Sequence, residues 1–333
     1  MTRLRVLVAV ARHGSVTAAA RSLNYAQPSV SHHLARLEAE TGATLTQRSG
    51  RGIRLTDAGR LLAGRAEEIL GRLDAAEREL AAHVEQRQER IRLAVFASAL
   101  ATIVPAALSR LAAGHPGIDL LLAEAEPPEA MRMLRAGQVD VALVSRHTQN
   151  GTPVGPAAAA EGARTRLILD EQVHLVTRPR HRGTQAAGQP ASGPPPAGEA
   201  GPPDLSALAH SPWIAGCEHC RGHLIWLCQH AGFSPKIAFT TDDHVAAQAL
   251  VAAGLGVTIL PGLAINAARH PGIHSQPLPG AWRQVLAVTY GQPPDPRAVD
   301  HLLDILTLAA AATATGAGAR SPAGGPGAGA GAA

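Results

Sequence analysis

The sequence is poor in aromatic residues, lysine and cysteine. Aromatic residues make up only 2% of the 333 residues, so the cores must be built from Leu, Val, Ile and Ala. Lys236 is the only lysine, so nearly all positive charge comes from arginine. Three cysteines are too few for a disulfide-stapled secreted scaffold and fit a reducing cytoplasm.

Long hydrophobic runs of the kind that cross membranes are also missing. Residues 245–265 carry no Asp, Glu, Lys or Arg, but Gly254, Gly256 and Pro261 divide this run into pieces typical of a buried α/β segment. Residues 1–10 are interrupted by an arginine and precede no cleavage site. The sequence therefore predicts a soluble cytoplasmic protein with no membrane partner.

Positive charge is concentrated at the N-terminus. Residues 1–65 contain ten arginines and three acidic residues, a net charge of +7. The whole chain carries only +4, so the remainder carries −3. This asymmetry predicts that an anionic polymer binds the N-terminal part.

The N-terminal residues have the pattern of a helix-turn-helix. Helices are expected over residues 2–12, 16–23 and 27–40, with Ser15 and Thr17 as candidate caps of the second. The third helix has a polar outer face, and an apolar stripe on its inner face at spacings of four and three. The stripe consists of Val30, Leu34 and Leu37. A glycine-centred hairpin is expected over residues 45–55, where arginines suit contact with a phosphate backbone.

Five short motifs within residues 2–65 carry a family resemblance. They are Gly-Ser-Val-Thr-Ala-Ala-Ala at 14–20, Gln-Pro-Ser-Val-Ser at 27–31, Leu-Glu at 37–38, Arg-Gly at 51–52 and Leu-Thr-Asp-Ala-Gly at 55–59. In this order and spacing they resemble the N-terminal signature of LysR-type transcriptional regulators. The resemblance implies a winged helix-turn-helix, over residues 1–58, that binds double-stranded promoter DNA.

Matching the motifs residue by residue gives the expected DNA contacts. The resemblance puts Gln27, Pro28, Ser31 and His32 at the groove, and the hairpin arginines on the phosphates. The full set is Gln27, Pro28, Ser29, Ser31, His32, Arg36, Arg48, Arg51 and Arg54. Thr46 stands where the family usually has Phe, so we expect weaker packing of the wing.

A long helix is expected to follow, with Thr56 as N-cap and a dimerisation segment over residues 59–88. Apolar residues recur along it at spacings of 4, 3, 4, 3 and 4, the seam of a coiled coil. They are Leu62, Ala66, Ile69, Leu73, Ala76 and Leu80. The pattern predicts a helix that pairs two subunits, in a dimer or a tetramer.

Strand-like and helical segments alternate over residues 89–308, which argues for open, mainly parallel sheets covered by helices. Residues 242–263 resemble the LysR effector domain. That resemblance implies an α/β body with two periplasmic-binding-protein-like lobes, lobe one at 91–166 and 280–308 and lobe two at 169–270. The Gly- and Pro-rich insertion at about 183–203 and the tail at 309–333 are expected to be disordered.

An effector site is expected where strands of the two lobes end, because ligands of open α/β sheets bind at the carboxyl ends of strands. The polar residues there are Ser98, Ser145, Cys217, His219 and Asp242. Ser98 and Asp242 could equally be helix caps. The sequence holds no catalytic triad, carboxylate pair or dinucleotide-binding loop at these positions, so we expect a small-molecule effector, no cofactor and no enzymatic activity.

All three cysteines cluster in one segment with several histidines. Cys217 and Cys220 form a C-x-x-C pair, and His219 and His223 are four residues apart. These four residues suit a zinc or copper site, a reversible disulfide, or a polar turn that lines the effector site. We favour the turn and keep a metal- or thiol-responsive regulator as the alternative. A solute-binding protein or an enzyme on the same lobes is a weaker alternative, because neither needs the basic N-terminal module.

Overall fold

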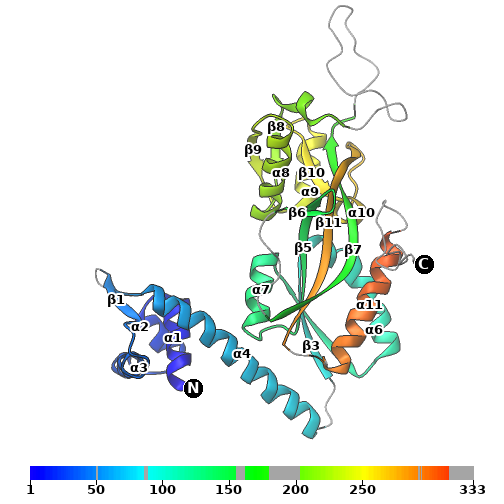
Figure 1. The fold of residues 1–333 in the computed structure, drawn as a ribbon. Coiled ribbons are helices and arrows are strands. Elements are labelled where there is room, and N and C mark those ends of the chain that lie inside the picture. Colours follow the sequence, from blue (N-terminus) through cyan, green and yellow to red (C-terminus); the bar gives the residue numbers. More distant parts are fainter. Residues whose placement is uncertain are drawn as a thin grey trace, which may run out of the picture.

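The computed structural model describes residues 1–49, 52–85, 89–154, 162–179, 203–291, 293 and 295–314. An N-terminal module is joined by one long helix to an elongated body of two lobes (Figure 1). In the described part of the chain, no helix combines the length and the hydropathy needed to cross a membrane.

The N-terminal module is the expected winged helix-turn-helix. Its elements are α1 (Thr2–His13), α2 (Val16–Ser22), α3 (Gln27–Thr41), β1 (Thr46–Ser49) and β2 (Gly52–Leu55). The Ser15 hydroxyl accepts a hydrogen bond from the Ala18 N–H at 3.0 Å, which confirms the predicted N-cap. The predicted inner stripe of α3 is buried against Leu7 and Ala19 of α1 and α2.

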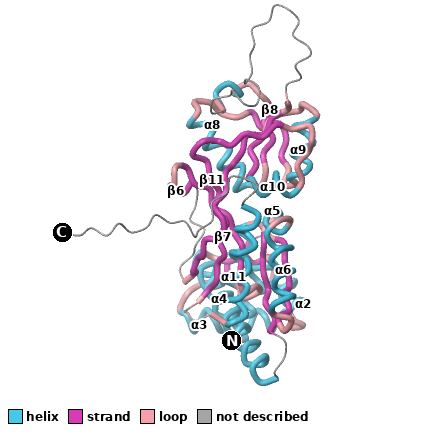
Figure 2. The backbone as a smooth tube through the Cα atoms, turned by 90° about the vertical axis from the view of Figure 1, so that its right-hand side faces the viewer, coloured by secondary structure: helices cyan, strands magenta, loops and turns pink. Residues whose placement is uncertain are grey.

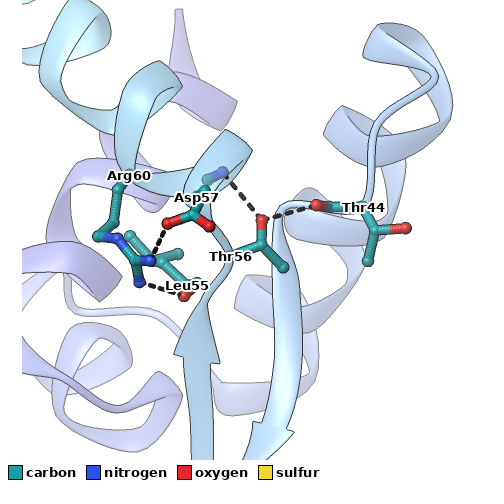
Figure 3. Close-up of polar contacts among 6 residues, drawn as sticks. Thr44, Leu55, Thr56, Asp57 and Arg60 are labelled. Atoms are coloured by element: carbon teal, nitrogen blue, oxygen red, sulfur yellow. Dashed lines mark hydrogen bonds and ion pairs between the residues drawn. The ribbon is translucent and has the colours of Figure 1, made fainter.

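Helix α4 (Asp57–Glu85) leaves the wing through a capping network (Figure 3). The Gly59 N–H donates to the Thr56 hydroxyl at 3.0 Å, and that hydroxyl donates to the Thr44 carbonyl at 2.7 Å. Arg60 donates to the Leu55 carbonyl at 2.8 Å and pairs with Asp57. The predicted cap thus ties the start of α4 to the backbone just before β1 and to the end of β2.

The predicted seam on α4 is divided between two roles. Ala66 is fully buried against Val8 of α1, and Leu62 is partly buried against the core of the module. Ile69 and Leu80 are 50% and 64% exposed. The seam is therefore wrong at Ala66, because that side of the helix packs on its own module, and the free stripe begins at Ile69.

The two lobes share one mixed sheet. Its strands are β3 (Glu89–Val95), β4 (Ile118–Glu124), β5 (Val141–Gln149), β6 (Thr152–Val154), β7 (Ala163–Thr177), β10 (Thr258–Pro261) and β11 (His274–Tyr290). The order is β10-β7-β11-β5-β3-β4, with β6 beside β5. Figure 2 shows β7 and β11 running from one lobe into the other. These two long strands are antiparallel to each other and to their neighbours, so the expectation of mainly parallel sheets was wrong.

Helices cover the sheet in both lobes. Lobe one has α5 (Ala97–Leu100), α6 (Ile103–Gly114), α7 (Pro127–Arg135) and α11 (Arg297–Ala314). Lobe two adds the parallel pair β8 (Pro212–Ala215) and β9 (Lys236–Thr240), the 3-10 turn η1 (Leu205–Leu208), and the helices α8 (Glu218–His230), α9 (His244–Ala252) and α10 (Gly262–Ala267). In each lobe, the carboxyl ends of the parallel strands lead into helices on the side that faces the other lobe. The polar residues at these strand-to-helix turns therefore lie at the junction of the lobes.

The C-terminal tail begins later than expected. Residues 309–314 continue α11, and Ala309 and Ala310 are fully buried in the core of lobe one. Alanine is the best helix former and fits a close helix contact, so an Ala-rich composition here indicates packing. Residues 315–333 and residues 183–202 of the expected insertion lie outside the described residues.

Candidate functional site

The outer face of α3 presents the predicted polar residues to solvent. Gln27, Pro28, Ser29, Ser31, His32 and Arg36 are all exposed. Beneath them Val30, Leu34 and Leu37 are 0%, 3% and 5% exposed, so the apolar stripe fixes which face points outward. Tyr25, at the start of this surface, is 43% exposed, and sequence reasoning missed it. Its signal was an aromatic residue in the turn before α3 of an aromatic-poor chain.

The wing is anchored to α3 by a carboxylate. One oxygen of Glu38 accepts hydrogen bonds from the Leu45 and Thr46 N–H groups, each at 2.8 Å, and from the Thr46 hydroxyl at 3.0 Å. A polar network therefore forms where an aromatic side chain was expected. Arg48 lies on β1, and Arg54 lies exposed on β2. Arg51 lies outside the described residues.

The lobes meet where their parallel strands end. Glu126 is the N-cap of α7, after β4 in lobe one, and Cys217 is the N-cap of α8, after β8 in lobe two. The side chains of Glu126 and Cys217 lie close to each other across the junction. Burial raises the pKa of Glu126, the neighbouring Cys217 thiol opposes that rise, and the nearby Asp242 adds to it.

A buried arginine lies at the centre of this junction. Arg283 of β11 is 2% exposed, and its Nε donates to the Glu171 carboxylate of β7 at 2.7 Å. Its terminal nitrogen donates to the Ser98 hydroxyl at 2.9 Å, and its guanidinium lies 5.0 Å from the ring centre of Phe96. The second oxygen of Glu171 accepts the Leu263 N–H at 2.6 Å. Burial raises the pKa of Glu171, whereas Arg283 and the Leu263 N–H lower it.

Three histidines stack beside this arginine. The His147 ring of β5 lies 4.1 Å from the His223 ring and 5.0 Å from the His219 ring, measured between ring centres. Burial lowers the pKa of all three, to about 4 for His223. Both ring nitrogens of His147 and His223 are buried without a hydrogen-bond partner among the described residues. The stack is therefore uncharged at neutral pH and has unused hydrogen-bonding capacity.

The structure brings four of the five predicted effector residues together and leaves one apart. Ser98, Cys217, His219 and Asp242 come together with Arg283 and Glu126, whereas Ser145 is 5% exposed on β5 opposite Val285. The cap of α9 is Asp243, not Asp242, since the Asp243 carboxylate accepts the Val245 N–H at 2.8 Å. Ser98 is not a cap either, because it lies inside α5. Sequence reasoning missed Arg283, Glu171, His147 and Glu126, although a single charge inside an otherwise uncharged strand was a usable signal for Arg283.

The two thiols of the C-x-x-C pair lie next to each other and shift each other's pKa in opposite directions. The interaction with Cys217 lowers the pKa of the Cys220 thiol, against its burial, while the pKa of Cys217 is raised by the interaction with Cys220 and by burial. Burial raises the pKa of Cys228 to about 12. Within the described ranges, no group of three or more His, Cys, Asp or Glu residues is arranged to hold a metal ion.

Two family models match the chain along most of its length. The model described as "LysR substrate binding domain" matches residues 85–311, which include both lobes. The chain belongs to the LysR family. The model described as "Bacterial regulatory helix-turn-helix protein, lysR family" matches residues 1–60. The chain is therefore a LysR-type transcriptional regulator, with a DNA-binding module and an effector-binding domain.

Individual relatives agree with this assignment. The chain is 29% identical over 273 residues to the uncharacterised regulator YcgK of Bacillus subtilis, which covers 79% of this chain and 80% of YcgK. It is 31% identical over 265 residues to a probable hydrogen peroxide-inducible genes activator of Mycobacterium avium, with 79% and 78% covered. The LysR regulator CbnR has the same fold, with a TM-score of 0.57 at 21% identity over 93% of this chain and 98% of CbnR.

Proposed function

We propose that this LysR-type regulator reads promoter DNA with the N-terminal half of α3 in the major groove and the β1–β2 hairpin on the phosphate backbone. The observation that carries the proposal is the exposed polar face of α3 above a buried apolar stripe. Side chains such as Gln27 and Ser31 discriminate base edges, whereas arginines on the wing neutralise phosphates.

Fluorescence anisotropy with the full-length protein tests these roles. Gln27→Ala and Ser31→Ala are expected to cost about 1–3 kcal/mol on DNA from the region upstream of the protein's own gene, and little on random DNA. Arg51→Ala is expected to weaken binding to both DNAs equally. It should also reduce the slope of log affinity against log salt concentration by about one. Arg90→Ala, far from the module, is the control. Equal losses on both DNAs for Gln27→Ala and Ser31→Ala would show that another element reads the bases.

The protein is further proposed to self-associate through α4. The support is an apolar stripe at spacings of 4, 3 and 4 along α4, formed by the exposed Ile69, Ala76 and Leu80 and the half-buried Leu73. Two such helices, one from each subunit, would bury the stripe. A dimer holds two DNA-binding modules and fits a site with two half-sites.

A small molecule bound at the junction of the lobes is proposed as the effector, in a cytoplasmic protein without catalytic activity. The support is the concentration of buried polar groups there, above all the ring nitrogens of His147 and His223 without partners among the described residues. A thermal-shift screen of small carboxylates, amines and amino acids tests the site, because a ligand of the folded state raises the melting temperature. His147→Phe is expected to abolish the shift, and His210→Phe, at an exposed position of lobe two, to keep it. A shift that survives His147→Phe would place the effector elsewhere.

One observation favours a thiol-responsive regulator as a second candidate. The neighbouring Cys217 thiol lowers the pKa of Cys220, and the Mycobacterium avium relative is named a probable hydrogen peroxide-inducible genes activator. In such a step two thiols lose two protons and two electrons to hydrogen peroxide, which becomes two molecules of water. A peroxide-dependent change in DNA binding that disappears in Cys217→Ser/Cys220→Ser would establish it. If wild type shows no such change, the small-molecule effector stands.

A further inference from the structure

Helix α4 packs against lobe one of the same chain with backbone touching backbone. A Cβ atom at Gly71 would lie 2.2 Å from the carbonyl carbon of Ala136 and 2.6 Å from the amide nitrogen of Gly137. A Cβ atom at Gly137 would lie 2.3 Å from the carbonyl oxygen of Gly71, and Gly137 has a φ of +60°. The neighbouring atoms belong to the backbone and cannot swing aside. Both positions therefore require glycine in this arrangement.

The position of Gly71 in its helix makes this contact informative. Glycine in the middle of a helix costs about 1 kcal/mol relative to alanine, so Gly71 weakens α4 unless a neighbour requires it. Gly64 lies two turns earlier on the same side of α4, and among the described residues no atom lies within 4 Å of its Cβ position. Gly71 is thus explained by lobe one, and Gly64 is a matched control.

A second contact holds α4 at the same place. The guanidinium carbon of Arg72 lies 4.5 Å from the ring centre of Tyr290, at the lobe-one end of β11. Such a cation–π contact is worth about 0.5–1 kcal/mol at an exposed site. At 100° per residue, Gly71 lies on the side of α4 opposite Ile69 and Leu73. The contact with lobe one therefore leaves the proposed dimer stripe free.

The DNA-binding module is packed on α4. Ala66 and Leu70 of α4 form a buried cluster with Val8 of α1. Glu67 accepts a hydrogen bond from Arg12 at 2.9 Å. A displacement of α4 at Gly71 therefore displaces the module.

Helix α7 joins this contact to the junction of the lobes (Figure 1). It begins after Glu126, which lies at the junction beside Cys217 of lobe two, and it ends at the Ala136–Gly137 turn that touches Gly71. Its nine residues span about 14 Å, and its inner side, including Met131 and Leu134, is buried against the sheet. One short, well-packed helix thus has one end at the proposed effector site and the other on α4.

We infer that α7 is the element that couples the junction of the lobes to the DNA-binding module. A movement of lobe two relative to Glu126 shifts α7, and the contact between Gly137 and Gly71 passes that shift to α4. This inference rests on the proposed function, since it names the route by which an effector between the lobes changes the placement of α3 on DNA.

Hydrogen–deuterium exchange on the full-length protein tests the route without any ligand. Glu126→Ala removes the side chain that faces Cys217 of lobe two at the start of α7, and so stands in for an effector. It is expected to speed amide exchange in residues 68–75 of α4 about tenfold in wild type and in Gly64→Ala. In Gly71→Ala, exchange in this segment is already fast, and Glu126→Ala adds nothing. Arg72→Met, a surface change that leaves the fold intact, is expected to speed amide exchange in residues 68–75 as Gly71→Ala does, but by a smaller factor.

Two results would overturn the inference. One is that Gly71→Ala exchanges like Gly64→Ala. The other is that Glu126→Ala leaves residues 68–75 of otherwise wild-type protein unchanged. The exchange measurement contains no DNA and no effector, so the route and the proposed function can fail separately. If the protein shows the coupling but binds no specific DNA, the proposed function is refuted and the route through α7 is kept. If the protein binds specific DNA but shows no coupling, the route is refuted and the proposed function is kept.

Discussion

The buried ion pair between Arg283 and Glu171 should dominate the stability of the effector-binding domain. Their side chains are 3% and 2% exposed, so Arg283→Met leaves a carboxylate out of water with only the Leu263 N–H, at 2.6 Å, to satisfy it. Removing one partner of a buried pair costs about 3–5 kcal/mol. Removing both, in Arg283→Met/Glu171→Met, eliminates the uncompensated charge and should cost no more than about 2 kcal/mol, for the unpaired Leu263 N–H and Ser98 hydroxyl.

Urea unfolding followed by tryptophan fluorescence measures this, because the three tryptophans, at 213, 226 and 282, all lie in the effector-binding domain. Arg90→Met is the control. Arg90 and Asp119 form a 3.0 Å pair whose side chains are 65% and 41% exposed, and exposed pairs contribute about 0–1 kcal/mol. The reasoning is refuted if Arg283→Met costs no more than Arg90→Met, or if the double variant is as unstable as the sum of the two single variants.

Other predictions concern the dimer, the wing and pH. Leu73→Glu should dissociate the dimer in sedimentation at micromolar concentration, because it charges the apolar stripe, and a variant that stays dimeric would place the interface elsewhere. Glu38→Ala should lower affinity for cognate and random DNA alike, since the wing loses three hydrogen bonds; a loss confined to cognate DNA would contradict this. Burial lowers the pKa of His223 to about 4, so as pH falls below about 6.5 this histidine is protonated in the unfolded chain before it is protonated in the folded one. The free energy of unfolding therefore decreases between pH 6.5 and 4, by about 1.4 kcal/mol per pH unit for this group. His223→Gln should flatten that slope in urea titrations, whereas the exposed His32→Gln should not.

The features that sequence predicted correctly depend on neighbours along the chain. The Ser15 cap and the buried stripe of α3 each involve residues a few positions apart. The pair of Arg283 and Glu171 joins residues 112 positions apart, and periodicity carries no information on such a contact. Strand direction was mispredicted for the same reason, because an apolar run does not record which neighbour it pairs with.

Ala66 shows a different limit. Its spacing fits a coiled-coil seam, but the same 3.6-residue period serves any apolar partner, and α1 of the same chain covers it. The Gly71 contact was invisible because glycine carries no side-chain signal, and its meaning depends on the backbone of lobe one.

Footprinting of the purified full-length protein on DNA upstream of its own gene shows whether α3 reads a specific operator. We expect two protected half-sites related by a dyad and separated by one or more helical turns, with the spacing or extent of protection altered by an effector. We also expect that Gln27→Ala removes the preference for these half-sites while general binding to DNA persists. Protection without sequence preference, or a pattern that Gln27→Ala leaves unchanged, would contradict the assignment of α3 as the helix that reads DNA.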